Sequence, residues 1–164
     1  MLKHLLFLLC SVCLFSCSSS KDSYRAFDKL SDVEDFMDKV FADGDAETFF
    51  YAADSSGVPE EVLKAIEESI PAMSESFANF KYDEKLVFDY PDYLKYREEK
   101  NADMSEWMRS VFKPMTWNYT PDKVIVYESH SPGEQSFTIY IGVVERKSKY
   151  VIVCTYWEPD SSAE

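Results

Sequence analysis

Cysteine and histidine are the first candidates for chemistry in this sequence, because their side chains act as nucleophiles, redox groups and metal ligands. The chain has four cysteines and two histidines. Cys10 and Cys13 have the CxxC spacing of a redox or metal-binding pair, but they lie inside an apolar N-terminal run. Cys154 and His130 are the remaining thiol–base combination. Because Cys154 lies within a strand-like segment, Tyr150–Trp157, we expect it to be a buried structural residue.

The N-terminus has the organisation of a secretion signal. Lys3 and His4 precede Leu5–Phe15, an apolar run of 11 residues. A membrane-spanning helix needs about 20 residues, so this run is expected to be a signal segment and not an anchor. The end of this run and the two residues after it, Leu14–Cys17 (LFSC), resemble the lipobox of bacterial lipoproteins. An ordinary secretory signal is the alternative, although Leu14–Ser16 fits its small-x-small cleavage pattern poorly.

The resemblance to a lipoprotein signal implies that Cys17 is acylated and becomes the new N-terminus. Residues 1–16 are then removed, and the polar residues that follow resemble a flexible tether, which we expect over 17–30. The expected location is the cell envelope, facing the periplasm or the surface, with the membrane as a partner through the lipid. Ser18 lacks the aspartate associated with inner-membrane retention, so the outer membrane is the expected membrane.

The length of the chain indicates how many domains it forms, and its charge indicates which partners it can bind. We expect one α+β domain over residues 31–159, followed by a mobile tail at 160–164. The chain carries 17 basic and 30 acidic residues, a net charge of −13. Such an acidic surface repels nucleic acid, so no nucleic-acid partner is expected. The sequence has no metal-ligand set, phosphate-binding loop or nucleophile elbow, so no cofactor is expected.

Helical periodicity begins at a capping-box pattern, Ser31–Glu34, and predicts a helix over Ser31–Phe41 with one apolar face. Gly44 is expected to end this helix in a left-handed conformation. Asp45 is then expected to cap a short second helix over Ala46–Ala53. The N-terminal half of the domain is therefore predicted to be helical.

Pro59 is expected at the first turn of a third helix, and Pro71 is expected to kink or split that helix near Ser69. A continuous apolar stripe runs along it and consists of Val62, Ile66, Ile70, Met73 and Phe77. Another helical unit is expected from a capping box at Asp103–Glu106. Its apolar face consists of Met104, Trp107, Met108 and Val111.

The C-terminal half shows β patterning. Strands are predicted over Lys85–Tyr90, Lys123–Ser129, Ser136–Glu145 and Tyr150–Trp157. A two-residue turn at Lys147-Ser148 would place Glu145 opposite Tyr150 and fix both faces of the last hairpin. One face, expected to be the core side, holds Phe137, Ile139, Ile141, Val143, Tyr150, Ile152, Cys154 and Tyr156.

The second face of that hairpin is too apolar for a bare solvent face. It carries Thr138, Tyr140, Gly142, Val144, Val151, Val153, Thr155 and Trp157. Either another part of this chain covers it, for which the segment Pro91–Pro114 is the candidate, or it is an interface with a second copy or an envelope protein. We predict the interface, and its candidate residues are Tyr140, Val144, Val151, Val153 and Trp157.

The order of elements is similar to the cystatin-like cone of the nuclear transport factor 2-like superfamily. The resemblance rests on Phe36–Phe50, which looks like the first two helices of that superfamily separated by a Gly-Asp step. It implies N-terminal helices packed on a curved antiparallel sheet that wraps a pocket. Enzymes of the superfamily place an acid–base residue in this pocket, and Asp89, Asp92 and Glu128 are the candidates here. The segment Pro91–Pro114 departs from the pattern, because it is longer and more helical than the usual connection.

Aromatic residues are dense between Phe80 and Tyr119, and Tyr90, Tyr93 and Tyr96 are the members expected to be exposed beside charged residues. Such residues can stack on sugars, although aromatic core packing is the simpler explanation. The predicted function is an envelope-anchored module that binds a protein partner or a small ligand. The alternative is a pocket enzyme using acid–base chemistry, such as an isomerase or cyclase, and glycan binding is third.

Overall fold

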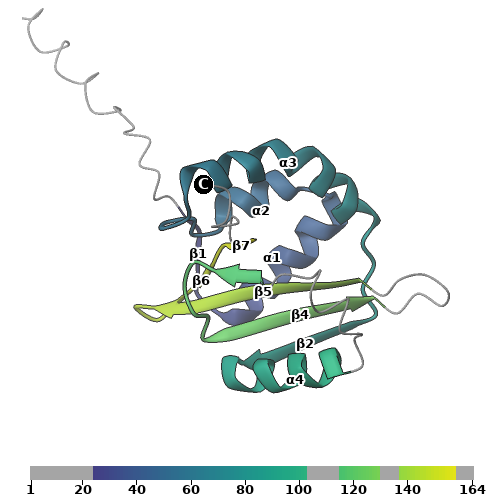
Figure 1. Ribbon diagram of the computed structural model, residues 1–164, viewed down its shortest axis with the longest axis vertical. Coiled ribbons are helices and arrows are strands. Elements are labelled where there is room, and N and C mark those ends of the chain that lie inside the picture. Colours follow the sequence, from purple (N-terminus) through teal and green to yellow (C-terminus); the bar gives the residue numbers. More distant parts are fainter. Residues whose placement is uncertain (1–23, 103–114, 130–136, 158–164) are drawn as a thin grey trace, which may run out of the picture.

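The computed structural model describes residues 24–102, 115–129 and 137–157. These residues form helices and antiparallel strands, which confirms the predicted α+β class. The elements are β1 (Ala26–Phe27), α1 (Leu30–Asp43), α2 (Ala46–Ala52), α3 (Glu60–Asn79), β2 (Glu84–Asp89), α4 (Tyr90–Ala102), β3 (Met115–Trp117), β4 (Lys123–Ser129), β5 (Phe137–Arg146), β6 (Lys149–Ile152) and β7 (Thr155–Trp157). A five-stranded sheet has the order β1-β6-β5-β4-β2, and β3 pairs with β7. Figure 1 shows α1, α2 and α3 on one side of the larger sheet and α4 on the other.

Helix α1 supplies the densest part of the core. It begins at Leu30, where the Asp32 carboxylate accepts a hydrogen bond of 3.0 Å from the Lys29 backbone N–H. The capping box predicted at Ser31–Glu34 is therefore wrong, and Glu34 instead lies 3.3 Å from Lys85 Nζ. The helix ends as predicted at Gly44, whose φ is 64°. Its apolar face packs on the sheet through Val33, Phe36, Met37, Val40 and Phe41, all of them buried.

Helices α2 and α3 follow from local signals that the sequence shows clearly. The Asp45 carboxylate accepts a hydrogen bond of 2.9 Å from the Thr48 N–H and caps α2, as predicted. Pro59 precedes α3 as its N-cap. Helix α3 then continues through Pro71 as one helix, so it is not split near Ser69, one of the two outcomes expected there. Its one buried residue is Phe77, although it has 20 residues.

The central strands have the predicted register. Strand β4 matches the predicted Lys123–Ser129, and Glu145 lies opposite Tyr150. The turn residues Lys147 and Ser148 both have positive φ values, 51° and 60°, as a tight hairpin turn of this type requires. The core face is confirmed, since Ile141, Val143 and Ile152 are buried in the same cluster as α1.

The last predicted strand, Tyr150–Trp157, is divided in the structure. Strand β6 leaves the larger sheet after Ile152, and β7 pairs with β3 instead. The reason lies at Asp54, whose backbone forms an isolated parallel bridge with Val153. Asp54 N donates to Ile152 O (2.8 Å), and Cys154 N donates to Asp54 O (3.3 Å). The connection between α2 and α3 therefore supplies the backbone hydrogen bonds that a neighbouring strand would otherwise make with residues 152–154.

The second face of the hairpin is covered within the chain, which is the alternative to the predicted interface. Helix α4, which lies mostly in the segment Pro91–Pro114 but ahead of the helix predicted there, packs against β2 and β4. Beside it, Trp117 lies so close to Gly142 that a Cβ there would overlap its ring. Val144, Val151 and Val153 pack against the same Trp117 and are 7, 1 and 2 % exposed.

The domain starts earlier than predicted. Strand β1 places Ala26–Phe27 in the larger sheet opposite Tyr150 and Val151. Phe27 is buried against Phe36, with ring centroids 5.3 Å apart. Part of the 17–30 segment expected to be a tether is therefore structured. Among the described residues, no helix is both long enough and apolar enough to cross a membrane.

Candidate ligand-binding cavity

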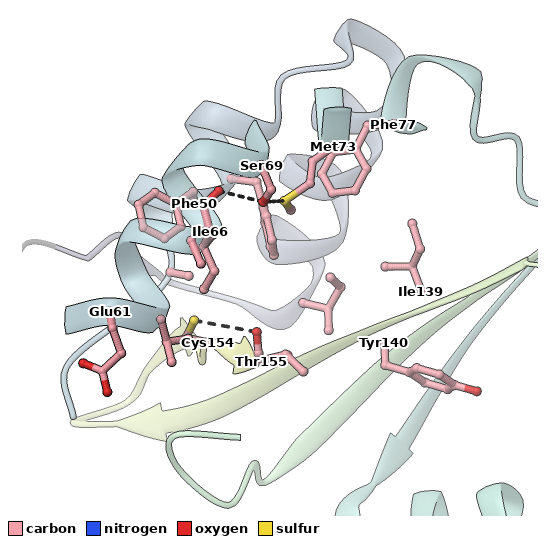
Figure 2. A pocket seen from close by; sticks show the side chains of 15 residues that line it. Phe50, Glu61, Ile66, Ser69, Met73, Phe77, Ile139, Tyr140, Cys154 and Thr155 are labelled. Carbon is pink, nitrogen blue, oxygen red and sulfur yellow. Dashed lines mark hydrogen bonds between the residues drawn. The ribbon is translucent and has the colours of Figure 1, made fainter. Parts of the chain in front are cut away.

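A cavity of about 620 Å³ lies between the helices and the core face of the larger sheet. Helices α2 and α3 form one wall, and β5 and the start of β7 form the other. Figure 2 shows these two walls with their side chains. The lining residues are Phe49, Phe50, Ala53, Glu61, Val62, Ala65, Ile66, Ser69, Met73, Phe77, Ile139, Tyr140, Ile141, Cys154 and Thr155.

The apolar stripe of α3 forms the helical wall. Four of its five predicted members, Val62, Ile66, Met73 and Phe77, line the cavity. The stripe would normally be buried against a sheet. Here Ala65 and Ser69 are small, and the helix stands away from the strands, so most of the stripe stays half-buried. The cavity is therefore the reason why α3 buries a single residue.

The sheet wall is also mostly apolar. Ile139 and Ile141 of β5 lie on it, in the core-face register that the hairpin predicts. Figure 2 shows the Tyr140 side chain directed away from the cavity. Its ring instead packs edge-on against Tyr93 of α4, with centroids 5.6 Å apart. A ligand in the cavity would therefore meet aliphatic side chains on this wall.

Few polar groups face this space, and most of those are already engaged. The Ser69 hydroxyl donates to Ile66 O (2.7 Å), so it satisfies a carbonyl of its own helix. Burial, followed by the nearby Asp54 charge, raises the pKa of the Cys154 thiol to about 11, which keeps it uncharged near neutral pH. Glu61, at the start of α3, is exposed and is the one charged residue among the lining residues that the structure describes.

A polar cluster around Asp54 holds the end of the cavity where Cys154 lies. Asp54 is 1 % exposed and pairs with Arg146, and Ser56 N donates to its carboxylate (2.9 Å). Burial opposes the charge on Asp54, but hydrogen bonds from Ser56 and the Arg146 charge outweigh it and lower its pKa. Asn118 Nδ2 donates to Asp54 O (2.6 Å) and so ties β3 to the same point.

The residues predicted for an interface and for sugar stacking lie away from the cavity. Tyr93 is 2 % exposed and Tyr96 is half-buried, because both point from α4 toward the sheet. The expectation that these tyrosines form an exposed group is therefore wrong. Trp157 lies in β7 opposite Met115. Cys17, His130 and the helix predicted from Asp103 lie outside the described residues.

None of the three candidate acid–base residues reaches the cavity. Glu128 is buried on the α4 side, where it pairs with Lys100 at 3.0 Å. Asp89 pairs with Lys123, and Asp92 lies 2.9 Å from Lys95 Nζ within α4. Within the described part of the chain, no group of three or more His, Cys, Asp or Glu residues is placed to hold a metal ion.

Sequence reasoning predicted the α3 stripe, and the resemblance implied a pocket wrapped by the sheet, but neither placed that pocket beneath the stripe. The available signal was the pair of small residues, Ala65 and Ser69, one turn apart beside the stripe. Small side chains at adjacent turns leave space that a packed helix face would fill. Comparison with protein families, curated proteins and solved structures finds no match to this chain, so its site is interpreted from its own chemistry.

Proposed function

We propose that this protein is an envelope-anchored binding module that holds a small apolar ligand in the cavity between α3 and β5. The observation that carries the proposal is the composition of the lining, in which ten of the fifteen described residues are Phe, Ile, Val, Met or Ala. Its volume of about 620 Å³ lies within the range of small-molecule sites in proteins. The proposed module thus binds by shape and apolar contact.

The half-buried stripe of α3 makes the binding of an apolar ligand energetically favourable. Side chains that border an empty space lack partner atoms on that side and lose the dispersion contacts of a packed core. An apolar ligand would restore these contacts for Ile66, Met73 and Ile139 together. It would also remove apolar surface from water, which favours binding by roughly 25 cal/mol per Å².

The lining favours binding over acid–base catalysis. A catalytic carboxylate is typically buried near the reacting atoms, so that its pKa shifts toward neutral pH. The acid in this lining, Glu61, is exposed, and the buried acids Asp54 and Glu128 are paired with Arg146 and Lys100. The described residues therefore give no observation that favours the isomerase or cyclase alternative.

A matched pair of serine variants on α3 tests the cavity. Ser69 lines it and Ser76 does not, while both hydroxyls donate to a carbonyl of their own helix. With the uncharged fluorescent probe N-phenyl-1-naphthylamine, Ser69→Trp should abolish binding because the indole fills the space. Ser76→Trp should bind as the wild type does. Absence of probe binding to the wild-type protein, or equal binding by all three proteins, would contradict the proposal.

A further variant tests whether the cavity is filled by a ligand or by a segment of the chain itself. In this variant Ser replaces each residue of the predicted apolar face, which consists of Met104, Trp107, Met108 and Val111. Under the proposal, this variant binds the probe no more tightly than the wild type. Probe binding that appears only in this variant would mean that the segment itself occupies the cavity.

The anchoring part of the proposal rests on the lipobox-like Leu14–Cys17. Cys17→Ala should move the protein from the membrane fraction to the soluble fraction, because the acylated sulfur is lost. Ser18→Ala is the matched control and should leave the protein in the membrane fraction. A Cys17→Ala protein that remains with the membrane through Leu5–Phe15 would contradict lipid anchoring.

A further inference from the structure

We infer that the ligand is an elongated amphiphile with one hydrocarbon chain and a cationic head group beside Glu61. This inference rests on the proposed function, and it adds the shape and the charge of the molecule. The shape follows from the positions that α3 contributes to the lining. The charge follows from the single ionisable carboxylate among the lining residues.

The cavity extends along α3. Its lining begins at Glu61 in the first turn of the helix and ends at Phe77 in the last. At 1.5 Å per residue, these positions are about 24 Å apart along the helix axis. At roughly 30 Å³ for each water-sized group, the volume accommodates about 20 non-hydrogen atoms. A long, narrow space of this size suits one extended chain better than a compact ring system.

Charge is confined to one end of this space. Figure 2 shows Glu61 at the end of the lining formed by the start of α3, apart from Phe77 and Ile139. The lining residues that the structure describes include no Lys, Arg or His, so these residues offer an anionic head group no counter-charge. Among the described residues, Glu61 itself has no ion-pair partner. A cationic head group would supply one.

The N-terminus of α3 opposes this preference but is too weak to reverse it. The helix dipole places about half a positive charge at that end, which by itself would attract an anion. Glu61 brings a full negative charge to the first turn, which is larger than the half charge of the dipole. The chain as a whole, with a net charge of −13, acts in the same direction.

Three probes with the same 14-carbon chain test the inference by competition with N-phenyl-1-naphthylamine, below their micelle-forming concentrations. They are tetradecyltrimethylammonium, the uncharged monomyristoylglycerol and myristate. An exposed ion pair strengthens binding by up to about fivefold. The cationic probe should therefore bind about fivefold more tightly than the uncharged one, and myristate should bind most weakly. High salt should reduce these differences, because it screens exposed charges.

Glu61→Gln assigns the preference to its residue, with Glu68→Gln as the control. Glu68 is exposed on the same helix and does not line the cavity. Glu61→Gln should bring the three affinities within about twofold of one another, and Glu68→Gln should keep the wild-type order. If no probe competes, the proposed function itself is wrong. If all three compete equally, if myristate binds best, or if Glu61→Gln leaves the order unchanged, the cavity binds ligand but the inferred head group is wrong.

Discussion

Helices α1 and α3 lie on the same side of the sheet and have similar apolar stripes, yet only one of them is a core helix. Helix α1 has 14 residues and buries five of them. Helix α3 has 20 residues and buries Phe77 alone. The stripe of α1 meets β-strand side chains directly, while the stripe of α3 faces a cavity of about 620 Å³.

The contrast shows that an apolar stripe identifies a helix face that avoids water, but not what that face meets. In α1 the partners are aromatic and aliphatic core residues, such as Tyr127, whose ring centroid lies 5.0 Å from that of Phe41. In α3, Phe77 packs on Phe41 at 5.2 Å. Ile70 and Met73 border the same core, while the rest of the stripe faces the cavity. The same pattern therefore serves stability in one helix and, as we propose, ligand binding in the other.

The two helices also differ in how the chain before them is held, and this difference gives the largest predicted effect. Helix α1 follows strand β1, whose Phe27 packs in the apolar core. The segment before α3 is held by Asp54, a buried carboxylate paired with Arg146. Asp54→Asn should destabilise the protein by about 3–5 kcal/mol, because it leaves a cation without its partner. Chemical denaturation at pH 7 measures the loss.

The same residue predicts a pH dependence. The pKa of Asp54 lies below its ordinary value in the folded protein, through Ser56 and Arg146 and against the effect of burial. Its contribution to stability is therefore complete above the unfolded pKa of about 4 and is lost as the pH falls through the lower folded value. The stability difference between wild type and Asp54→Asn should shrink below pH 4. A difference that stays constant to pH 2 would contradict this account.

The same substitution, Met to Ala, can be made in both helices and tests the comparison between them. Met37 of α1 is fully buried, and Met73 of α3 is half-buried and lines the cavity. Met37→Ala should cost about 2–5 kcal/mol of unfolding free energy, the range for a packed core methionine. Met73→Ala should cost about 1 kcal/mol, because its side chain already lacks contacts on one side. Equal losses would mean that α3 is packed as a core helix is.

The opposite face of the sheet offers the next largest effect. A Cβ at Gly142 would lie 2.8 Å from Val153 Cγ2 and would overlap the Trp117 ring. Gly142→Ala should therefore destabilise the protein by about 1–3 kcal/mol, as overpacking typically does. In a double-mutant cycle, Trp117→Ala should recover part of that loss. No coupling between the two sites would contradict the view that Trp117 closes this face.

Local signals in the sequence predicted the helix starts and strand registers well. Asp45 caps α2, Gly44 ends α1, and Lys147-Ser148 sets the register of the last hairpin, since each depends on residues that are neighbours in the chain. The capping box at Ser31–Glu34 was wrong because Asp32 caps the helix instead, by accepting from the Lys29 N–H, while Glu34 lies near Lys85. Lysine is not among the residue types favoured at the N-cap, so this start could not be read from the usual capping pattern.

Long-range features account for what the sequence did not show. The break between β6 and β7 depends on Asp54, which lies about a hundred residues earlier in the chain. The second face of the sheet is covered by α4, whose tyrosines were predicted from the sequence to be exposed. The cavity depends on how far α3 stands from β5. Each of these is a property of tertiary packing, which residue type and periodicity do not specify.

Cys154 gives the smallest expected effect, a change in reactivity without a change in stability. It is 7 % exposed and lines the cavity, and burial raises its pKa to about 11. At pH 8 only about one thiol in a thousand is then the reactive thiolate, so N-ethylmaleimide should label it at least about a hundredfold more slowly than in the unfolded chain. Mass spectrometry of the Cys154 peptide distinguishes this residue from the other cysteines. A bound cavity ligand should slow the labelling further, as should Ser69→Trp but not Ser76→Trp. Native labelling as fast as that of the unfolded chain would show that the thiol is not buried in an apolar space beneath α3.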